Sequence, residues 1–378
     1  MLDYEILKII WWALIVVLLI GFAIADGFDM GVGILLPFAA REDIERRQTL
    51  NVLAPHWDGN QVWFITAGGA VFAAWPVVYS VAFSGFYWAL LLVLFAMFFR
   101  PVGFEYRSKI DSPKWRSTWD WALFAGSFVP VLVFGVAFGN LFQGAPIELD
   151  EFVRLNYEGN LFGLLNPFAI LCGLVSVTLL AMHGGTYLQL RTDGEVEARS
   201  QKFTQWAALG FIITFALAGV WLAFGIDAYQ VKTMGDINAA MVISQKTVVH
   251  EGSWLANYSA FPALIAAPVL GFAGAALALL LARGGRPGWA FISSSLAIAG
   301  TIVTAAGCLF PFILPSSLDP KSSLLVWDAT SSHLTLHIMF IAAVIFVPII
   351  LIYTFWCYWK LWGKVRKQAI LDNPMGHY

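Results

Sequence analysis

Residues 55–63 read PHWDGNQVW, and this segment decides how the rest of the chain is interpreted. It places the carboxylate of Asp58 and the imidazole of His56 beside two amides and two indoles, directly before a long apolar run. Charged and strongly polar side chains are costly to bury at membrane depth, and they usually have a function there. If the chain spans a membrane, the segment therefore marks a candidate functional site.

The composition is that of a polytopic membrane protein. Hydrophobic residues make up 59% of the 378 residues and charged residues 12%, whereas soluble domains carry roughly 25% charged residues. Nine or ten spans of about 20 residues fit this length, so we expect a single membrane domain over residues 1–378. The three cysteines lie in apolar runs without CxxC spacing, which gives no indication of a disulfide framework or of attached haem c.

Nine apolar runs predict nine transmembrane helices. The first run is roughly 45 Å long at 1.5 Å per residue, which exceeds the roughly 30 Å hydrocarbon core. Its inner end, with Asp26 and Asp29, should therefore be lined by protein or water. The start of the chain lacks the features of a cleaved signal, so we read it as a retained span. A Ser or Asp of the segment 327–332, before the last run, suits a helix N-cap. The runs cover about residues 7–36, 60–78, 80–99, 118–139, 161–182, 204–226, 258–282, 288–312 and 334–358.

The loops between these runs alternate in charge. Five alternate segments hold 17 of the 22 Lys and Arg residues. Loops rich in Lys and Arg stay on the cytoplasmic side of a membrane. The N-terminus is therefore expected in the periplasm and the C-terminus in the cytoplasm, and no basic run indicates nucleic-acid binding. The five segments are residues 38–57, 100–117, 184–203, 283–287 and 359–378.

This topology brings distant polar residues to one depth. Asp26 and Asp29 are three residues apart and share a helix face. We expect Asp29, Asp58, Arg100 and Glu105 near the cytoplasmic boundary of one helix cluster. Burial disfavours the charged form of a carboxylate and a nearby guanidinium favours it, so acids around one arginine can pass protons along. The alternative is a neutralised set of charges that holds three helices together.

The histidines do not form a pattern that would bind haem. His333 and His337 are four residues apart near the external start of the last run, and two ligands on one helix face cannot bind one iron from opposite sides. His56 and His183 lie at inner helix ends. We therefore expect no b-type haem held by the chain's own histidines, and no other metal site.

Four separated motifs resemble subunit II of the cytochrome bd-type ubiquinol oxidase, and the likeness runs the whole length of the chain. The resemblance implies an all-α polytopic membrane protein with nine transmembrane helices, built as two four-helix bundles plus a peripheral helix. It also implies a subunit, not catalytic alone, of a bacterial inner-membrane complex that couples ubiquinol oxidation to the reduction of O2 to water. The motifs are DGFDMGVG at 26–33, PHWDGNQVW at 55–63, FFRPVGF at 98–104 and WDATSS at 327–332.

The resemblance also implies cofactors and partners. Haem d and haem b595 would lie near the interface with cytochrome bd subunit I, which would hold haem b558 and the quinol-oxidation loop. Trp57 and Trp63 match residues of the family motifs, and we expect them on the haem d side or along an oxygen route. A structural ubiquinone in some members, and small single-span accessory subunits, would complete the complex in the lipid bilayer.

The proton-path acids of the family map onto two residues of this chain. Asp29 and Asp58 match those acids, and Arg100 matches a motif arginine. Glu105 stands where the family pattern has Asp, so its side chain is one methylene longer and its role less certain. A path through these residues would take protons from the cytoplasm to the oxygen-reducing haem.

Two other functions remain open at this point. A proton-coupled secondary carrier would also place acids within helices, although carriers bind near the midplane at broken helices. A purely structural assembly subunit would use the same acids only to hold its helices together. In that case neutralising Asp29 or Asp58 would cost haem retention before it cost rate.

Overall fold

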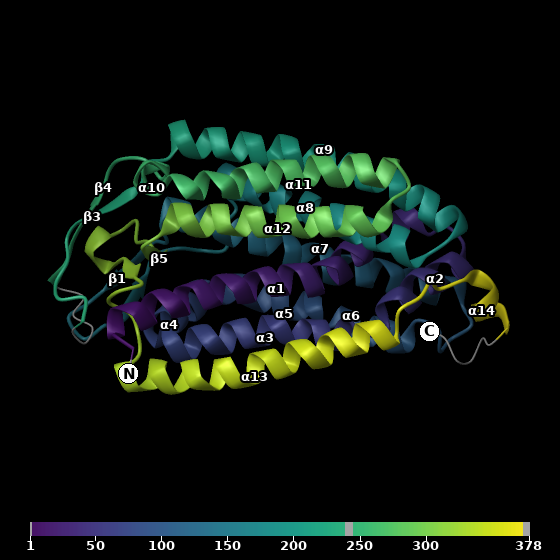
Figure 1. The fold of residues 1–378 in the computed structure, drawn as a ribbon, viewed down its shortest axis with the longest axis horizontal. Helices are drawn as coiled ribbons and strands as arrows, with labels where there is room; N and C mark the ends of the chain where they lie inside the picture. The colour runs from purple at the N-terminus through teal and green to yellow at the C-terminus, as the bar shows by residue number, and fades with distance from the viewer. Residues whose placement is uncertain (1, 239–244, 373–378) are drawn as a thin grey trace.

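The computed structural model describes residues 2–238 and 245–372, which form long helices running side by side along the molecule (Figure 1). Eight helical segments are long and apolar enough to cross a membrane. They are α1 (Tyr4–Ala39), α5 and α6 together (Tyr87–Met97, Phe99–Tyr106), α7 (Pro113–Gln143), α8 (Pro167–Arg191), α9 (Gly194–Gly225), the 3-10 turn η2 with α11 (Pro262–Ile265, Ala266–Arg283), α12 (Pro287–Leu309) and α13 (His333–Lys360).

Shorter elements complete the fold, most of them at the two ends of the molecule, whereas α3 runs along α1 between the ends (Figure 1). We call the end that carries α2 and α14 the α2 end, and the opposite end, where the strands lie, the strand end (Figure 1). The shorter helices are α2 (Asp43–Leu53), α3 (Trp57–Ala74), α4 (Pro76–Gly85), α10 (Ala256–Ala260), the 3-10 turn η3 (Pro320–Ser322) and α14 (Lys367–Asp372).

Within residues 2–238 and 245–372, three two-stranded antiparallel sheets lie in the loops at the strand end (Figure 1). The all-α prediction did not contain them. Tyr157 pairs with Ile147, His250 with Tyr229 and Leu325 with Phe312. Strands of two to five residues are too short to show a hydrophobic alternation in the sequence. The strands are β1 (Ile147–Leu149), β2 (Leu155–Tyr157), β3 (Tyr229–Thr233), β4 (Thr247–His250), β5 (Phe312–Leu314) and β6 (Leu324–Leu325).

The predicted helix over 60–78 differs most from the observed structure. The helix α3 ends at Ala74, and Pro76 opens α4 at its first turn, where the missing N–H of proline is tolerated. The polar start of α3 lowers its hydropathy, so only eight segments of the described chain meet the composition of a span where nine were predicted. The helix α3 nevertheless packs along α1 (Figure 1).

Other helix ends follow local signals that the apolar runs did not include. The helix α8 begins at Pro167, after the N-cap Asn166, so the predicted start at 161 was wrong. The helix α9 begins ten residues before the predicted 204, because its first turns are polar. The predicted N-cap of the last helix is confirmed, since Ser332 Oγ accepts from the backbone N–H of Thr335 at 3.2 Å.

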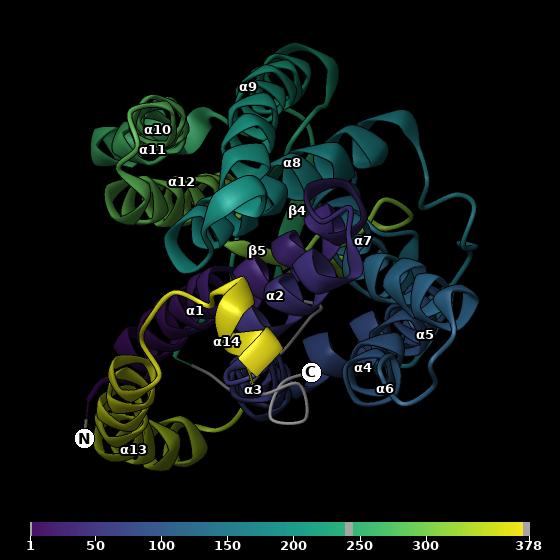
Figure 2. The same cartoon turned by 90° about the vertical axis from the view of Figure 1, so that its right-hand side faces the viewer.

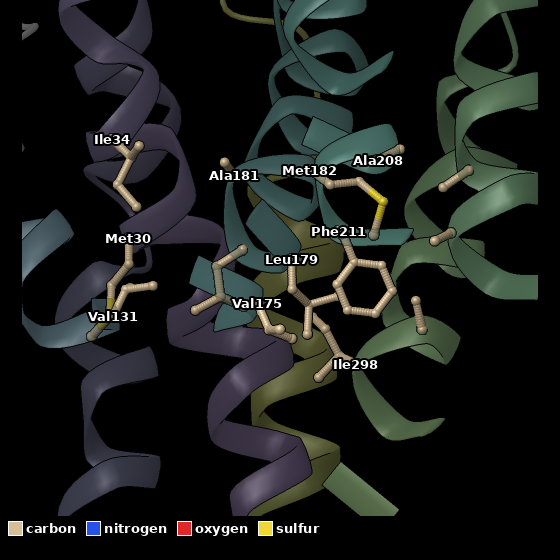
Figure 3. Packing of buried hydrophobic residues seen from close by; sticks show 14 of the residues in the cluster. Met30, Ile34, Val131, Val175, Leu179, Ala181, Met182, Ala208, Phe211 and Ile298 are labelled. Atoms are coloured by element: carbon tan, nitrogen blue, oxygen red, sulfur yellow. The ribbon is translucent and has the colours of Figure 1, made fainter. Parts of the chain in front are cut away.

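The packing core lies where α1 crosses α7 and α8. Viewed from the α2 end, α8, α9, α11 and α12 lie on one side of α1, and α3 to α6 lie on the other (Figure 2). Buried side chains from α1, α7, α8, α9 and α12 interdigitate between these groups (Figure 3). Lipid tails are as apolar as leucine, so this close packing itself, more than escape from water, holds the helices together.

The crossing of α1 and α8 is a direct backbone contact. A Cβ atom added at Gly31 would lie 1.9 Å from the carbonyl oxygen of Leu180, and one added at Gly184 would lie 2.3 Å from the Gly31 carbonyl carbon. Glycine at both positions is therefore required for the observed spacing. The crossing is close to Asp29, so it fixes the depth of that residue relative to α8.

Candidate functional site

Asp26 and Arg100 form a buried bidentate ion pair between α1 and α6. Arg100 donates from one terminal nitrogen to Asp26 Oδ1 at 2.5 Å and from the other to Oδ2 at 3.1 Å. Both residues are no more than 1% exposed. Paired hydrogen bonds of this kind fix the planes of both groups. The pair therefore supplies a rigid, neutralised wall beside the next acid on α1.

Asp29 lies one helical turn beyond Asp26 and is 1% exposed. Its Oδ2 accepts a hydrogen bond from Asn60 Nδ2 at 2.8 Å, and Asn60 Oδ1 accepts one from Tyr358 at 2.6 Å. Asp29 Oδ1 is buried without a hydrogen-bond partner among the described residues. A buried polar atom without a partner is costly, so this oxygen is expected to meet water.

A small cavity borders Asp29 at the point where α1, α2, α6 and α7 meet. It offers about 10 Å³ to the centre of a water molecule, which is close to the smallest space that holds one ordered water. Asp29 and Arg100 line it together with the hydroxyl-bearing Thr49 and Ser127. The cavity thus has polar partners for a single water, and apolar side chains from the same four helices enclose the rest.

Two of the four predicted acid-cluster residues are outside this buried group. Asp29 and Arg100 both line the cavity. Asp58 and Glu105 are exposed on the surface of the chain. Asp58 is nevertheless close in sequence to Asn60, which bonds Asp29, so it lies at the same end of α3. Of the four residues expected to lie together, Asp29 and Arg100 are buried beside the cavity, and Asp58 and Glu105 lie on the surface.

The two predicted tryptophans lie on either side of the start of α3. Trp57 stacks on Phe104 of α6, with ring centroids 5.1 Å apart. Trp63 packs against the main core, and a Cβ added at Gly21 would come within 2.8 Å of its ring. Both indoles therefore fill space between α3 and its neighbours.

A network of ion pairs holds α2 over the cavity. Asp120 of α7 accepts from Arg46 of α2 and from Arg107, each at 2.6 Å. Arg107 also donates to Asp43 at 2.9 Å. The carboxylate of Asp120 is buried, so losing either arginine would leave it short of a partner. The network joins α2 to α7 and to the end of α6.

Glu45 anchors the other side of α2. It accepts hydrogen bonds from the backbone N–H of Arg41 at 2.8 Å, from Arg199 of α9 at 2.7 Å and from Lys367 of α14 at 3.0 Å. Burial alone would raise the pKa of Glu45, but these hydrogen bonds outweigh it and lower the pKa to about 2. The carboxylate therefore stays charged at neutral pH and links α2 to α9 and α14.

His56 is the buried N-cap of α3 and stacks on the ring of Tyr358, with centroids 4.1 Å apart and planes 11° apart. Burial, helped by the positive charge of Arg191, lowers the pKa of His56 to about 4. The folded protein therefore keeps the imidazole neutral at pH values where an exposed histidine takes up a proton.

This shift predicts a loss of stability in mild acid. As the pH falls below 6.5, the unfolded chain protonates His56 and the folded chain does not, so stability falls until the pH reaches about 4. The variant His56→Phe keeps a stacked ring but cannot take up a proton. Between neutral pH and pH 5 we expect it to lose less free energy of unfolding than the parent protein, by on the order of 1 kcal/mol. Thermal unfolding of the purified complex at several pH values measures this. His250→Phe is the control, because His250 is exposed and stacks on Tyr229 in the same way. An equal change in both variants would contradict the assignment.

Hydrogen bonds within the protein engage ring nitrogens of His183 and His333. His183 is fully buried, but its Nδ1 lies 2.7 Å from Ser294 Oγ and its Nε2 lies 3.0 Å from the Ile24 carbonyl oxygen. Both nitrogens are therefore in use. His333 Nε2 is 2.7 Å from the carbonyl oxygen of Leu2. Residues 2–238 and 245–372 contain no cluster of three or more His, Cys, Asp or Glu suited to a metal ion. His183 therefore has no free ring nitrogen for a haem iron, whereas His56 Nε2 and His337 Nδ1 are buried without a hydrogen-bond partner among the described residues.

The site contains three residues that the sequence analysis did not select. Asp26 pairs with Arg100, and its three-residue spacing from Asp29 was a usable signal. Asn60 belongs to the polar segment 55–63, whose amides were noted without a role. Tyr358 gave no signal, because an apolar pattern does not tell which helix α13 contacts.

Comparisons with known proteins agree with one another over the whole chain. The family model for cytochrome bd terminal oxidase subunit II matches residues 7–361. Cytochrome bd-I ubiquinol oxidase subunit 2 of Escherichia coli (strain K12) is 56% identical over 379 residues, covering 100% of both chains. Cytochrome bd ubiquinol oxidase subunit 2 of Bacillus subtilis (strain 168) is 33% identical, covering 97% of this chain and 98% of the relative.

A solved structure has the same fold. The structure of bd oxidase from Geobacillus thermodenitrificans contains a chain that superposes with a TM-score of 0.64 at 15% sequence identity. The match covers 95% of this chain and 99% of the other. At this identity the likeness concerns the arrangement of the helices and not the residues of the site.

Proposed function

This chain belongs to the cytochrome bd terminal oxidase subunit II family, and on that premise we propose that it carries protons from the cytoplasm toward the oxygen-reducing haem through Asp29. It is a subunit of a cytochrome bd ubiquinol oxidase, an oxidoreductase complex of the respiratory chain. The oxidation of ubiquinol and the reduction of O2 belong to the cofactors of the complex, whereas the protein controls access and electrostatics.

The observation that carries the proposal is the unpartnered Oδ1 of Asp29, on a residue that borders a cavity of water size. A water in this space would hydrogen-bond the carboxylate and connect it to the hydroxyls of Thr49 and Ser127. The neighbouring side chains Asp26 and Arg100 form an ion pair with no net charge. Among the described side chains, Asp29 itself has no ion-pair partner that would hold it permanently in the charged form.

The surface acids complete the proposed path. Asp58 and Glu105 are exposed to water, and they form the proposed entrance of the path toward Asp29. Arg100 lines the cavity along this path and is held in position by its ion pair with Asp26. Trp57 and Trp63 belong to α3, and their indole rings fill space between α3 and its neighbours. We propose that they lie on the haem d side or along an oxygen route.

The orientation in the membrane is part of the proposal. Lys and Arg concentrate in the loops at the α2 end, which supports a cytoplasmic location for that end and the C-terminus and a periplasmic location for the N-terminus. We count α3 as the ninth span, since it runs along α1. Residues 1–378 then form a single membrane domain of two four-helix bundles with α13 as the peripheral helix.

The cofactors and partners follow from the family. Haem d and haem b595 would lie at the interface with subunit I, and haem b558 within it. The engaged nitrogens of His183 support this assignment, because they leave that buried histidine without a free ligand atom. A structural ubiquinone and small single-span accessory subunits are further proposed components.

The test is the substitution Asp29→Asn in the complete oxidase. The amide keeps the shape of the carboxylate but does not take up and release a proton at ordinary pH, so we expect the rate of O2 reduction to fall by about tenfold or more at normal haem content. Asp3→Asn, at the other end of α1, is the control and should leave the rate unchanged. Normal turnover in Asp29→Asn would refute the proton path. A rate that falls only in proportion to lost haem would instead assign the acid a structural role.

A further inference from the structure

We propose that Asn60 is the positioning residue for Asp29 and that Tyr358 of the peripheral helix α13 holds Asn60 in place; this rests on the proposed function of Asp29. The three side chains come from α1, α3 and α13 and form one line of hydrogen bonds. Each of the two ends of the Asn60 amide has one partner, and Asn60 is 2% exposed.

The chemistry of the groups fixes the direction of this line. While Asp29 is ionised, its carboxylate only accepts hydrogen bonds, so the Asn60 nitrogen faces it, at 2.8 Å from Oδ2. The Asn60 oxygen then faces the Tyr358 hydroxyl at 2.6 Å, and the hydroxyl must donate. A rotated amide would place two acceptors against each other at Asp29. For the ionised acid, the network thus admits one arrangement of the amide.

This arrangement selects which oxygen of Asp29 is available. An amide side chain does not take up and release protons at ordinary pH, so the line through Asn60 and Tyr358 is a support and not a proton route. It occupies Oδ2 and leaves Oδ1 without a partner in the part of the chain that the structure describes, on a residue that borders the water-sized cavity. Asn60 therefore sets the orientation in which Asp29 meets water.

Tyr358 is itself held on two sides. Its ring stacks on His56, with centroids 4.1 Å apart, and meets Phe28 of α1 edge-on at 6.4 Å. Along the rest of α13 the side chains are mostly exposed, and Leu336, near the other end, is its only fully buried residue. The contact at Tyr358 is therefore where the peripheral helix reaches the acid site.

Two substitutions separate positioning from packing. Asn60→Leu removes both hydrogen bonds at similar volume, and Tyr358→Phe removes only the hydroxyl while keeping both ring contacts. Tyr353→Phe, an exposed tyrosine of the same helix, is the matched control. In the complete oxidase we expect turnover to fall about tenfold in Asn60→Leu and several-fold in Tyr358→Phe. Haem content and the KM for quinol should be unchanged in both, and Tyr353→Phe should match the parent.

Infrared difference spectroscopy supplies a readout that a structural role would not move. The carboxyl band of Asp29 is identified by its disappearance in Asp29→Asn. This band should shift in Asn60→Leu and in Tyr358→Phe and stay in place in Tyr353→Phe. An unshifted band in both variants overturns the proposal, and so does a turnover loss that follows haem loss in both. If Asn60→Leu does not assemble, Tyr358→Phe decides. If Asp29→Asn proves fully active, the proton path fails, while a shifted band still supports the positioning of Asp29.

Discussion

In Arg100→Met the haem-containing complex is expected to be largely lost from the membrane. The substitution leaves the Asp26 carboxylate in a site that is 0% exposed, with both of its hydrogen-bond donors removed. Breaking a buried pair by removing one member typically costs about 3–5 kcal/mol, because a charge is left without compensation. The yield of spectrally intact oxidase and its thermal unfolding midpoint measure the loss.

The double variant Asp26→Leu and Arg100→Met is the control for this result. Replacing both members by apolar groups removes the uncompensated charge, and buried pairs treated in this way are often neutral in stability. We expect the double variant to recover most of the yield that the single variant loses. Equal loss in both variants, or full assembly of Arg100→Met, would show that the ion pair does not hold α1 and α6 together.

The second large effect is expected at the strand end, in Asp328→Asn. Lys246 and Asp328 are both buried and form an ion pair, and Lys246 also donates to the Ser323 carbonyl oxygen. Without the carboxylate, the ammonium of Lys246 stays buried and unbalanced, which costs about 3–5 kcal/mol. Burial lowers the pKa of Lys246 and the Asp328 carboxylate opposes that effect. More of the lysine is neutral in alkaline buffer. The loss of stability in Asp328→Asn should therefore be smaller in alkaline buffer than in neutral buffer.

Hydrogen exchange and limited proteolysis of the loop around β4 and the loop after β5 would report the loosening in Asp328→Asn. Lys232 and Glu251 supply the matched control, because they form an exposed ion pair beside the same β3–β4 hairpin. Exposed pairs contribute about 0–1 kcal/mol, so Glu251→Gln should change little. Equal protection of both loops in Asp328→Asn and in the parent would contradict the prediction.

The polar end of α1 was largely predictable from the sequence. Its length placed Asp26 and Asp29 beyond the lipid, and the alternation of spans brought Arg100 to the same depth. The sequence did not tell which of the two acids would take the guanidinium. That choice depends on side-chain rotamers and on the rotation of α6 about its axis, which a hydropathy pattern does not contain.

The placement of Asp58 shows a different limit of the pattern. At 3.6 residues per turn, Asp58 and Asn60 project about 200° apart around α3. Only one of them can face α1, and in the structure it is Asn60. No feature of the segment 55–63 indicates that the amide is preferred over the acid at this position. The apolar run continues through the break at Trp75, so hydropathy did not show it, although Pro76 is of a residue type that kinks or ends helices.

The contact between Gly31 and Gly184 limits which substitutions this sequence can accept during evolution. Any replacement at either site adds at least one carbon to a space already filled by main-chain atoms. Gly219 of α9 meets no atom within 4 Å of an added Cβ. We therefore expect natural variants of this chain to keep the first two glycines through long divergence and to exchange the third freely.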